Sequence, residues 1–400
     1  MTTAPTTAPE RTNTSLSRAL TLVHTHRADL RTDLTERLGL TRTATGLVLR
    51  ELQTLSLIRS AAVQRSDGGS SSTGRPSHAV EIHPDAPVVL AVQVQAETVL
   101  VAEARLGGTL GRIDEFALPA PATPESVLGL LAQVLSERLT TAVRLPFGIG
   151  LALPSAVGSD GTALAAHHLA WPHAVPVRRM LGNLLTASGH GDVRMSIGND
   201  ANLAALAESR HGAGQGAGQM LYVMTGQVGV GGGLVVDGRL HLGSAGYALE
   251  IGHTPVPPGD RLCRCGNRGC LEVEADPAAL LAAAEIVTNE PTLLAARSVI
   301  AHRRDNPSSG SAVELITRRL AAGLASMVNV LNPDRIVLGG LYADLLAAEE
   351  SELRAGITRH SFLDQAAQVE LRAAGLGASA LTGAAELAFQ PLLDDPRLLV

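Results

Sequence analysis

The sequence predicts a protein of two parts, a small winged helix-turn-helix at the N-terminus followed by a larger α/β body. Three observations support this prediction. The chain has 400 residues, which is more than one compact core normally holds. Residues 15–82 combine three helical patterns with two short strand-like runs. From about Pro87 onward, apolar strand-like runs alternate with helical patterns, as they do in α/β folds.

The N-terminal segment and the hydropathy of the chain indicate a cytoplasmic protein. Residues 1–14 are rich in Thr, Pro and Ala and lack the apolar core of a signal peptide, so we expect a disordered tail there. No stretch approaches ~20 uninterrupted apolar residues, and we therefore expect no membrane span.

The head has the pattern of a helix-turn-helix. Residues 15–25 carry apolar side chains at a helical spacing, and a second short helix is expected over residues 32–38. Gly39 then supplies a turn, and Thr41 can cap a third helix that runs to about residue 55. The buried stripe of this third helix is expected at Ala44, Leu47, Val48, Leu52 and Leu55.

The outward face of the third helix carries the residues that we expect to contact DNA. Arg42, Thr43 and Arg50 fall outside the expected buried stripe, and Thr45 lies near its edge. Basic and hydroxyl side chains on the second helix of such a pair favour contacts with phosphates or the major groove. We therefore predict that Arg42, Thr43 and Arg50 contact DNA, with Thr45 as a further candidate. The alternative is a three-helix module that binds another protein.

A hairpin is predicted directly after the third helix. Two strand-like pieces, residues 59–65 and 78–82, flank a loop of Gly and Ser that ends in Gly74-Arg75-Pro76. Such a loop with an arginine near its end can reach phosphates or a minor groove, which is how a wing works. Arg75 is therefore a fifth candidate for a DNA contact.

The distribution of charge supports this interpretation of the head. The net charge of the chain is −6, which by itself argues against a nucleic-acid-binding protein. Between Arg11 and His78, however, ten arginines face five acidic residues, so this segment carries +5 and the rest of the chain −11. A basic head on an acidic body is expected when only the head contacts phosphates.

All three cysteines of the chain fall within eight residues and follow a nearby histidine. An odd number of clustered cysteines indicates a metal site more than disulfides. One imidazole and three thiolates form a closed tetrahedral set, so we expect a structural Zn²⁺, with no open position for a catalytic water. The alternative is three free cysteines beside an unrelated histidine. The expected ligands are His253, Cys263, Cys265 and Cys270.

Three segments of the body resemble motifs of the ROK family, which contains bacterial sugar kinases and sugar-sensing repressors. The pattern His-x9-Cys-x-Cys-Gly-x2-Gly-Cys-x-Glu runs from His253 to Glu272. An Asn-Asp-Ala-Asn element lies within residues 196–208, and a helix, strand and glycine loop span residues 329–340. The head, with Gly74-Arg75-Pro76 before the body, resembles the regulator branch of the family, which includes the xylose and N-acetylglucosamine repressors.

The resemblance covers nearly the whole chain and implies its overall organisation. It implies the two-lobed, actin-like and hexokinase-like ATPase fold for residues 83–400, behind a DNA-binding domain over residues 15–82. The boundary between the lobes is expected near residues 195–200, with the C-terminal segment returning to the first lobe. A homodimer or higher homo-oligomer is the expectation from the family.

The resemblance also implies a sugar site between the lobes. In the family's kinases, the aspartate that matches Asp200 is the general base that deprotonates a sugar hydroxyl. Residues matching Asn199, Glu250, His253 and Glu272 contact sugar hydroxyls. This is chemically reasonable, because a polyol requires several acceptors fixed on rigid elements, and a metal can fix the loop that presents them. For Asp200 the alternative is a helix N-cap, a common role of aspartate.

The sequence departs from the family's kinases at both phosphate loops. The first loop of a kinase is of the Asp-x-Gly-Gly-Thr type, whose glycines let backbone N–H groups approach the phosphates. The corresponding stretch here is Gln93-Val94-Gln95-Ala96-Glu97, and the carboxylate of Glu97 would repel a triphosphate. In the second loop Val228 replaces the hydroxyl residue, and the remaining glycines can serve a close strand pair. We therefore expect no kinase activity and regard Asp200 as a vestigial base.

These observations together predict a sequence-specific transcriptional regulator of sugar metabolism, with repression as the expected direction. Its partners are expected to be a double-stranded DNA operator, bound by the head, and a sugar or sugar derivative, bound by the body. When bound to DNA it would lie on the nucleoid. The alternative is an ATP-dependent sugar kinase with a DNA-binding head, which Asp200 favours. A third possibility is a regulator that has lost sugar binding and responds to a partner protein.

Overall fold

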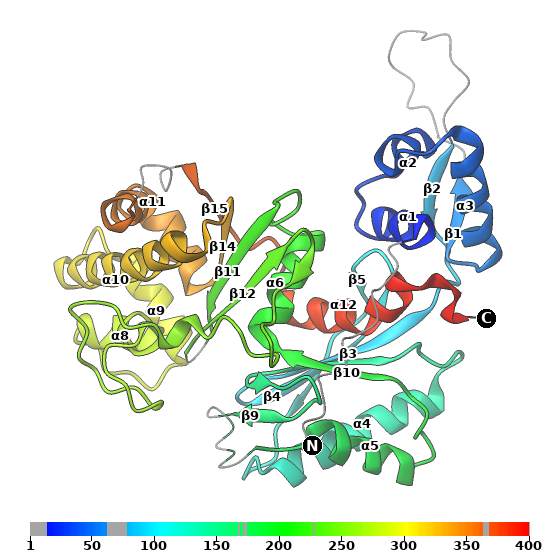
Figure 1. The fold of residues 1–400 in the computed structure, drawn as a ribbon. Helices are drawn as coiled ribbons and strands as arrows, with labels where there is room; N and C mark the ends of the chain where they lie inside the picture. The colour runs from blue at the N-terminus through cyan, green and yellow to red at the C-terminus, as the bar shows by residue number, and fades with distance from the viewer. Residues whose placement is uncertain are drawn as a thin grey trace, which may run out of the picture.

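The structure is a computed structural model that describes residues 14–61, 78–166, 169, 171, 174–226, 229–362 and 368–399 (Figure 1). Three predicted features lie outside these residues: the tail over residues 1–13, the wing loop with Arg75, and Val228 in the second glycine-rich loop. No helix of the described part is long and apolar enough to cross a membrane.

The head contains the three predicted helices and a two-stranded sheet. They are α1 (Ser15–His24), α2 (Arg31–Leu38), α3 (Arg42–Thr54), β1 (Ile58–Ala61) and β2 (Ala79–Ile82), with β1 and β2 antiparallel. Gly39 ends α2 in the left-handed region at φ 66°, as a glycine turn requires. The Thr41 side chain accepts a hydrogen bond from the Ala44 N–H at 3.2 Å and so caps α3, as predicted.

The buried face of α3 differs from the prediction by a rotation of about one residue. Its buried residues are Thr45, Gly46, Leu49 and Leu52, whereas Leu47 is 57% exposed. The reason is Thr45, whose hydroxyl donates to the carbonyl of Thr41 at 3.1 Å. A threonine whose hydroxyl is satisfied within its own helix can be buried. Thr45 therefore faces inward, where the apolar pattern predicted its neighbours.

The first sheet of the body has six strands in the order β10-β7-β3-β4-β5, with β6 also paired to β4. Leu90 and Val92 of β3 pack in one hydrophobic cluster with α4 and α5, while Val89 and Ala91 pack in another with α12. This alternation is that of a central strand covered on both faces. The bounds are β3 (Val88–Val94), β4 (Thr98–Arg105), β5 (Thr109–Leu110), β6 (Asp114–Ala117), β7 (Ile149–Leu153), β10 (Met195–Asn199), α4 (Pro124–Thr141), α5 (Val177–Ala187) and α12 (Ser379–Asp394). A separate hairpin pairs β8 (Ala156–Val157) with β9 (Ala163–Ala165).

The second sheet has five strands in the order β13-β12-β11-β14-β15. Helices α8–α11 share one hydrophobic cluster with β11 and β14, and α6 contacts β11 and β12 (Figure 1). The strands are β11 (Gln219–Thr225), β12 (Val230–Val236), β13 (Arg239–Leu240), β14 (Arg335–Gly340) and β15 (Glu370–Ala373). The helices are α6 (Asp200–His211), α7 (Leu271–Glu274), α8 (Pro277–Ala283), α9 (Thr292–Ala301), α10 (Pro307–Leu331) and α11 (Leu341–His360), with short 3-10 helices η2 (Ile251–His253) and η4 (Pro396–Leu399).

Helix α12 connects these parts of the molecule. It contacts α6, β3 and β7, and the head stands on its C-terminal half (Figure 1). Two glycines permit very close packing: a Cβ on Gly150 would lie 1.8 Å from the carbonyl oxygen of Ala384, and one on Gly383 would lie 1.9 Å from that of Leu203. Helix α12 therefore packs in close backbone contact with both β7 and α6. The domain division at residues 82/83 and the lobe boundary near 195–200 remain predictions.

Candidate functional site

The strand-to-helix junction between β10 and α6 presents two of the predicted sugar residues. The Asn199 side chain accepts from the Asn202 N–H at 2.9 Å and donates to the Ser155 carbonyl at 3.1 Å. Asn199 is therefore the N-cap of α6. Asp200 is the first helical residue, and its Oδ1 accepts from the Ala201 N–H at 2.8 Å. The alternative role of Asp200 as the N-cap is thus taken by its neighbour.

The carboxyl groups of Asp200 and Glu250 both have raised pKa values. The pKa of Asp200 is raised to about 6, mainly by burial; the Ala201 N–H opposes this rise and the nearby Glu250 contributes to it. Burial also raises the pKa of Glu250; His253 opposes this and Glu272 adds to it. Three carboxyls and one imidazole thus influence one another electrostatically. Such a set can accept hydrogen bonds from several hydroxyl groups at once.

The four predicted metal ligands lie together. The Nδ1 or Nε2 of His253 and the three Sγ atoms are all within 4.8 Å of one another. The His253 Nδ1 lies 3.6 Å from the Sγ of Cys263, and the Sγ atoms of Cys265 and Cys270 are 3.7 Å apart. Ligands around a tetrahedral Zn²⁺ with bonds of about 2.3 Å stand about 3.8 Å apart, so this donor set fits the ion. All three cysteines are free thiols.

Glu272, one of the predicted sugar residues, lies beside two of the four predicted metal ligands. An oxygen of Glu272 lies 2.8 Å from the Sγ of Cys263 and 3.6 Å from the Nδ1 of His253. The cysteine loop turns back at Gly266 and Gly269, with φ of 94° and 71°, values that glycine adopts without strain. Glu272 follows the predicted ligand Cys270 by two positions, so fixing the four ligands would restrain it through the chain.

The stretch that replaces the first phosphate loop is a tight turn between β3 and β4. The Gln95 N–H donates to the Thr98 carbonyl at 2.8 Å, and the Thr98 hydroxyl donates to the Gln95 side chain at 3.0 Å. Ala96 and Glu97 are exposed at its tip. The turn thus closes on itself through its own side chains and leaves the carboxylate of Glu97 exposed.

The outward face of α3 carries three of the predicted DNA contacts. Arg42, Thr43 and Arg50 are exposed. Thr45 is completely buried, so the prediction that Thr45 contacts DNA is wrong. Sequence reasoning missed Leu47, whose exposed side chain lies one helical turn from both Thr43 and Arg50. The available signal was Thr41, since a hydroxyl residue four positions later can bond to its carbonyl.

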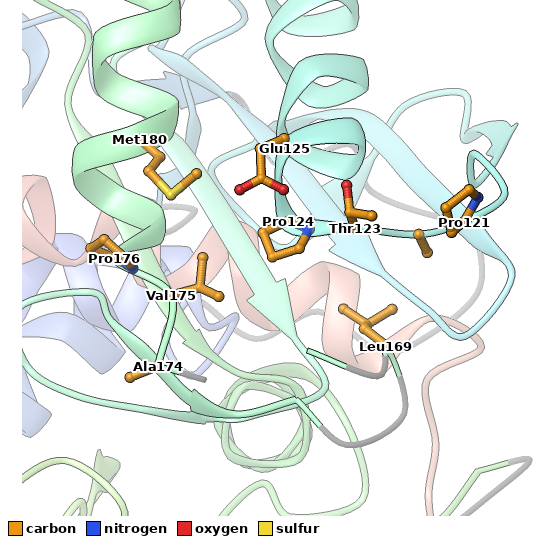
Figure 2. A pocket seen from close by; sticks show the side chains of 10 residues that line it. Pro121, Thr123, Pro124, Glu125, Leu169, Ala174, Val175, Pro176 and Met180 are labelled. Atoms are coloured by element: carbon orange, nitrogen blue, oxygen red, sulfur yellow. The ribbon is translucent and has the colours of Figure 1, made fainter. Parts of the chain in front are cut away.

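A separate cavity of about 510 Å³ lies beside the N-terminal ends of α4 and α5 (Figure 2). Apart from Glu125 and Thr123 its lining is apolar, and it includes none of the predicted sugar or metal residues. The lining residues are Pro121, Ala122, Thr123, Pro124, Glu125, Leu169, Ala174, Val175, Pro176 and Met180.

The two sheets, with α6 and α12 packed between them and acidic residues around the start of α6, define a two-lobed α/β protein of the actin and hexokinase type. More particularly, the chain belongs to the ROK family, whose sequence pattern matches residues 105–390. Among curated relatives, the xylose repressor of Caldicellulosiruptor bescii is 26% identical over 77% of this chain and 79% of its own length. The glucokinase of Halalkalibacterium halodurans is 35% identical over 48% of this chain and 61% of its own length.

Solved structures share the fold. A ROK family transcriptional regulator, a homologue of the E. coli MLC protein, superposes with a TM-score of 0.76 at 23% identity, covering 95% of this chain and 96% of its own. A ROK glucokinase from Streptomyces griseus in complex with glucose and AMPPNP gives 0.63 at 24% identity, covering 76% and 99%. The likeness to the regulator thus includes the length of the head. The xylose repressor likewise matches most of this chain, whereas the glucokinase matches about half of it.

Proposed function

We propose that this protein is a DNA-binding transcriptional regulator of sugar metabolism whose body binds a sugar or sugar derivative. One observation carries the proposal: an exposed basic recognition helix and a cluster of sugar-type acceptors lie on one chain in which the phosphate loop is a closed turn. Repression is the expected direction of control, in keeping with the names of the relatives. The expected location is the cytoplasm, on the nucleoid when DNA is bound.

The DNA contacts are assigned to the exposed ridge of α3. Arg42 and Arg50 would neutralise phosphates or bind guanine edges, and Thr43 would contact the backbone or a base. Leu47 lies between Thr43 and Arg50, where it would meet base edges; the C5 methyl of thymine is the apolar group exposed there. Glu51 on the same helix is paired with Arg397 at 2.7 Å, which reduces its repulsion of DNA.

The sugar contacts are assigned to Asn199, Asp200, Glu250, His253 and Glu272. These residues come from the start of α6 and from the segment around η2 and α7, so a ligand between them would draw the two segments together. Closure of lobes around a sugar is the kind of movement that changes the spacing of two heads in a homodimer. Operator half-sites lie about 34 Å apart or a multiple of that, so a change in spacing alters DNA affinity.

Zinc is proposed as a structural ion held by His253, Cys263, Cys265 and Cys270. When bound, the ion would supply a cross-link between η2 and the cysteine loop rather than a reactive centre, because four protein ligands fill its coordination. The chain's own contribution is Glu272, which follows the ligand Cys270 by two positions and lies 3.6 Å from the Nδ1 of His253. The metal site would thereby keep the acceptors of the sugar site in place.

A sugar kinase is the second candidate, and Asp200 is the observation that favours it. A carboxyl with a pKa of about 6 is suited to general-base catalysis near neutral pH. Against it stands the Gln95–Thr98 turn, which presents Glu97 where a kinase binds phosphate.

Two assays on the same purified protein distinguish these functions. Fluorescence anisotropy with DNA from upstream of its own gene is expected to give specific binding that competes poorly with unrelated DNA. A coupled assay with ATP, Mg²⁺ and a panel of hexoses and N-acetyl sugars is expected to give no turnover. Turnover that Asp200→Asn abolishes would establish the kinase instead.

A further inference from the structure

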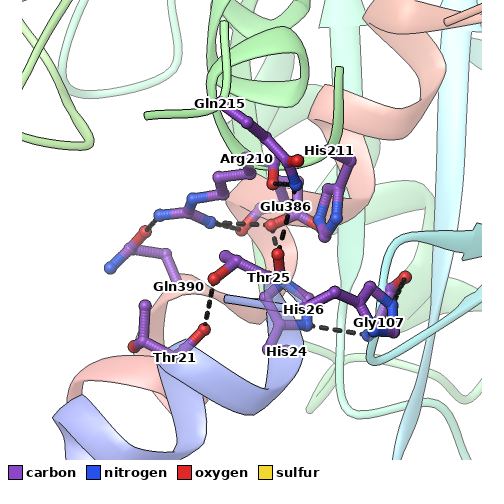
Figure 3. A network of polar contacts seen from close by, with 10 residues as sticks. All are labelled: Thr21, His24, Thr25, His26, Gly107, Arg210, His211, Gln215, Glu386 and Gln390. Atoms are coloured by element: carbon purple, nitrogen blue, oxygen red, sulfur yellow. Dashed lines mark hydrogen bonds and ion pairs between the residues drawn. The ribbon is translucent and has the colours of Figure 1, made fainter. Parts of the chain in front are cut away.

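A buried polar cluster joins the head to the body (Figure 3). His24, the last residue of α1, has its Nε2 2.7 Å from an oxygen of Glu386 on α12, and both side chains are fully buried. The His24 Nδ1 accepts a hydrogen bond from the Gly107 N–H at 2.9 Å. Nδ1 therefore carries no proton, Nε2 carries it, and the neutral ring donates to Glu386. Burial, which lowers the pKa of His24, agrees with the neutral ring.

Glu386 receives two further donors from the end of α6. Arg210 Nη1 lies 2.9 Å from one carboxylate oxygen, and His211 Nε2 lies 3.0 Å from the other. We call His24, Arg210, His211 and Glu386 the junction cluster. Three donors on one buried carboxylate satisfy a charge that would otherwise be strongly unfavourable in the interior.

A second metal site is the competing interpretation, because two imidazoles and a carboxylate are metal-ligand types. The hydrogen bonds argue against it. A metal on the Nε2 of His24 would require the proton to move to Nδ1, where it would meet the N–H of Gly107. Arg210 also occupies the carboxylate with a positive charge. The cluster is therefore an ion-pair network.

The junction cluster lies at the far end of the helix that begins at the candidate sugar site. Helix α6 has 12 residues, starting at Asp200 and ending at His211, so it spans about 18 Å. About one turn from its start, α6 is pressed against α12 at the Leu203–Gly383 contact, backbone against backbone. Helices packed this closely cannot slide past each other without a clash, so a shift of α6 is transmitted to α12 and Glu386.

The head is fastened to this pair of helices at more than one point. The Gln215 side chain, just beyond α6, donates to the Thr25 carbonyl at 3.2 Å. The Ser17 hydroxyl donates to the Leu393 carbonyl of α12 at 2.7 Å. Helix α1 thus contacts α12 along its length and the end of α6 through its last turn.

We propose that the junction cluster couples the sugar site to the DNA-binding head, with His24 as the positioning residue on the head. This inference rests on the proposed function and specifies its regulation. Hydrogen bonds of 2.7–3.0 Å tolerate little displacement, and a buried carboxylate that loses a donor is penalised. When a sugar moves the start of α6, α1 must follow Glu386, and α3 moves with it because the three helices share one core.

The test measures the coupling itself on the full-length protein. Operator affinity is determined with and without D-glucose, D-xylose or N-acetylglucosamine, and affinity for the same sugar with and without operator. The two ratios must agree, and about 5- to 150-fold is the usual range. His24→Ala is expected to bind operator alone and sugar alone as the unaltered protein does. The ratio of the affinity for one ligand with and without the other should fall toward 1. His24→Gln, whose amide can donate to Glu386 and accept from Gly107, is expected to recover part of it.

His26→Ala is the matched control. His26 is exposed, and its Nε2 lies 3.1 Å from the carbonyl oxygen of Gly107. Its ion-pair partner is Asp29 and not Glu386. It should keep the ratio of the unaltered protein. If His24→Ala fails to fold, hydrogen exchange on the unaltered protein decides: sugar must change protection at the end of α1 and at Gly107. An unchanged ratio in His24→Ala, or unchanged exchange, overturns the coupling alone; no DNA or sugar binding by the unaltered protein overturns the proposed function with it.

Discussion

The Nε2 of His24 lies 2.7 Å from an oxygen of Glu386, although 362 positions separate the two residues in the sequence. The pair joins the last turn of the first helix of the head to the C-terminal helix of the body. Because neither side chain is exposed, the head cannot rotate away from the body without exposing or orphaning a charged group. The head is thus built into the fold at a defined orientation.

The cysteine cluster gives the most direct chemical prediction. With zinc bound, none of the three thiols should react with a maleimide under native conditions; after a strong chelator all three should react. Because the chain has no other cysteine, every thiol counted reports on this site. Cys265→Ser should reduce bound zinc from about one per chain toward zero and lower the melting temperature.

Arg268→Ala is the control in the same loop. Arg268 pairs with Asp260 only at the surface, and such pairs contribute about 0–1 kcal/mol. Zinc content and melting temperature should therefore change little. Full native reactivity of all three thiols in freshly purified, metal-replete protein would contradict the metal site.

Asp200→Asn should stabilise the unliganded protein at neutral pH. Burial raises the pKa of Asp200 to about 6, so the ionised form is disfavoured in the folded state. The stability of the protein with a protonated Asp200 is fully present below pH 4 and is lost as the pH rises through 6. The free energy of unfolding of the variant should therefore rise relative to that of the unaltered protein over this interval, by at most about 3 kcal/mol. Urea unfolding between pH 4 and 8 measures it, with the exposed Asp192→Asn as the control.

The same Asp200→Asn substitution should weaken sugar binding, because the amide is a poorer acceptor than the carboxylate. The sugar-induced rise in melting temperature should fall while the melting temperature without sugar does not. A variant less stable than the unaltered protein at pH 8 would show that Asp200 serves the fold rather than a ligand.

Arg50→Ala should weaken operator binding and reduce the slope of log affinity against log salt by about one, if Arg50 contacts a phosphate. Arg318→Ala, which removes the same charge from an exposed position of α10 paired with Glu314, should leave the slope unchanged. Equal effects of the two substitutions would show that only net charge matters and that Arg50 of α3 makes no specific contact with DNA.

Leu47 should read a thymine methyl group. Replacing operator thymines one at a time by deoxyuridine removes only the C5 methyl, and at the contacted position the affinity should fall by about 0.8 kcal/mol, or about fourfold. In Leu47→Ala the same replacement should have no effect, because the methyl no longer has a partner. If both proteins respond identically at every position, Leu47 does not face the bases.

Local patterns in the sequence predicted what local chemistry determines. The four predicted metal ligands, which lie within 18 residues of one another, come together in the structure. The predicted buried face of α3 was wrong because the Thr45 hydroxyl bonds within its own helix. A stripe of apolar residues does not reveal such a bond. The N-cap of α6 was assigned to Asp200 as an alternative, but Asn199 forms it, since its side chain reaches the Asn202 N–H.

The junction cluster could not be predicted. Its members come from three helices and are separated by up to 362 positions. The histidines and the arginine are ordinary helix-end residues, and Glu386 is an ordinary glutamate in the middle of α12. Only the packing of α12 against both α1 and α6 brings them together. Interactions set by topology rather than by neighbours in the chain are beyond single-sequence reasoning.

The most direct test of the central claim is the affinity of the protein for DNA from upstream of its own gene, titrated in the absence and presence of individual sugars and N-acetyl sugars. We predict specific binding whose dissociation constant is changed several-fold by one of these sugars, with the unrelated sugars inert. Binding no stronger than to unrelated DNA, under every condition, would contradict it.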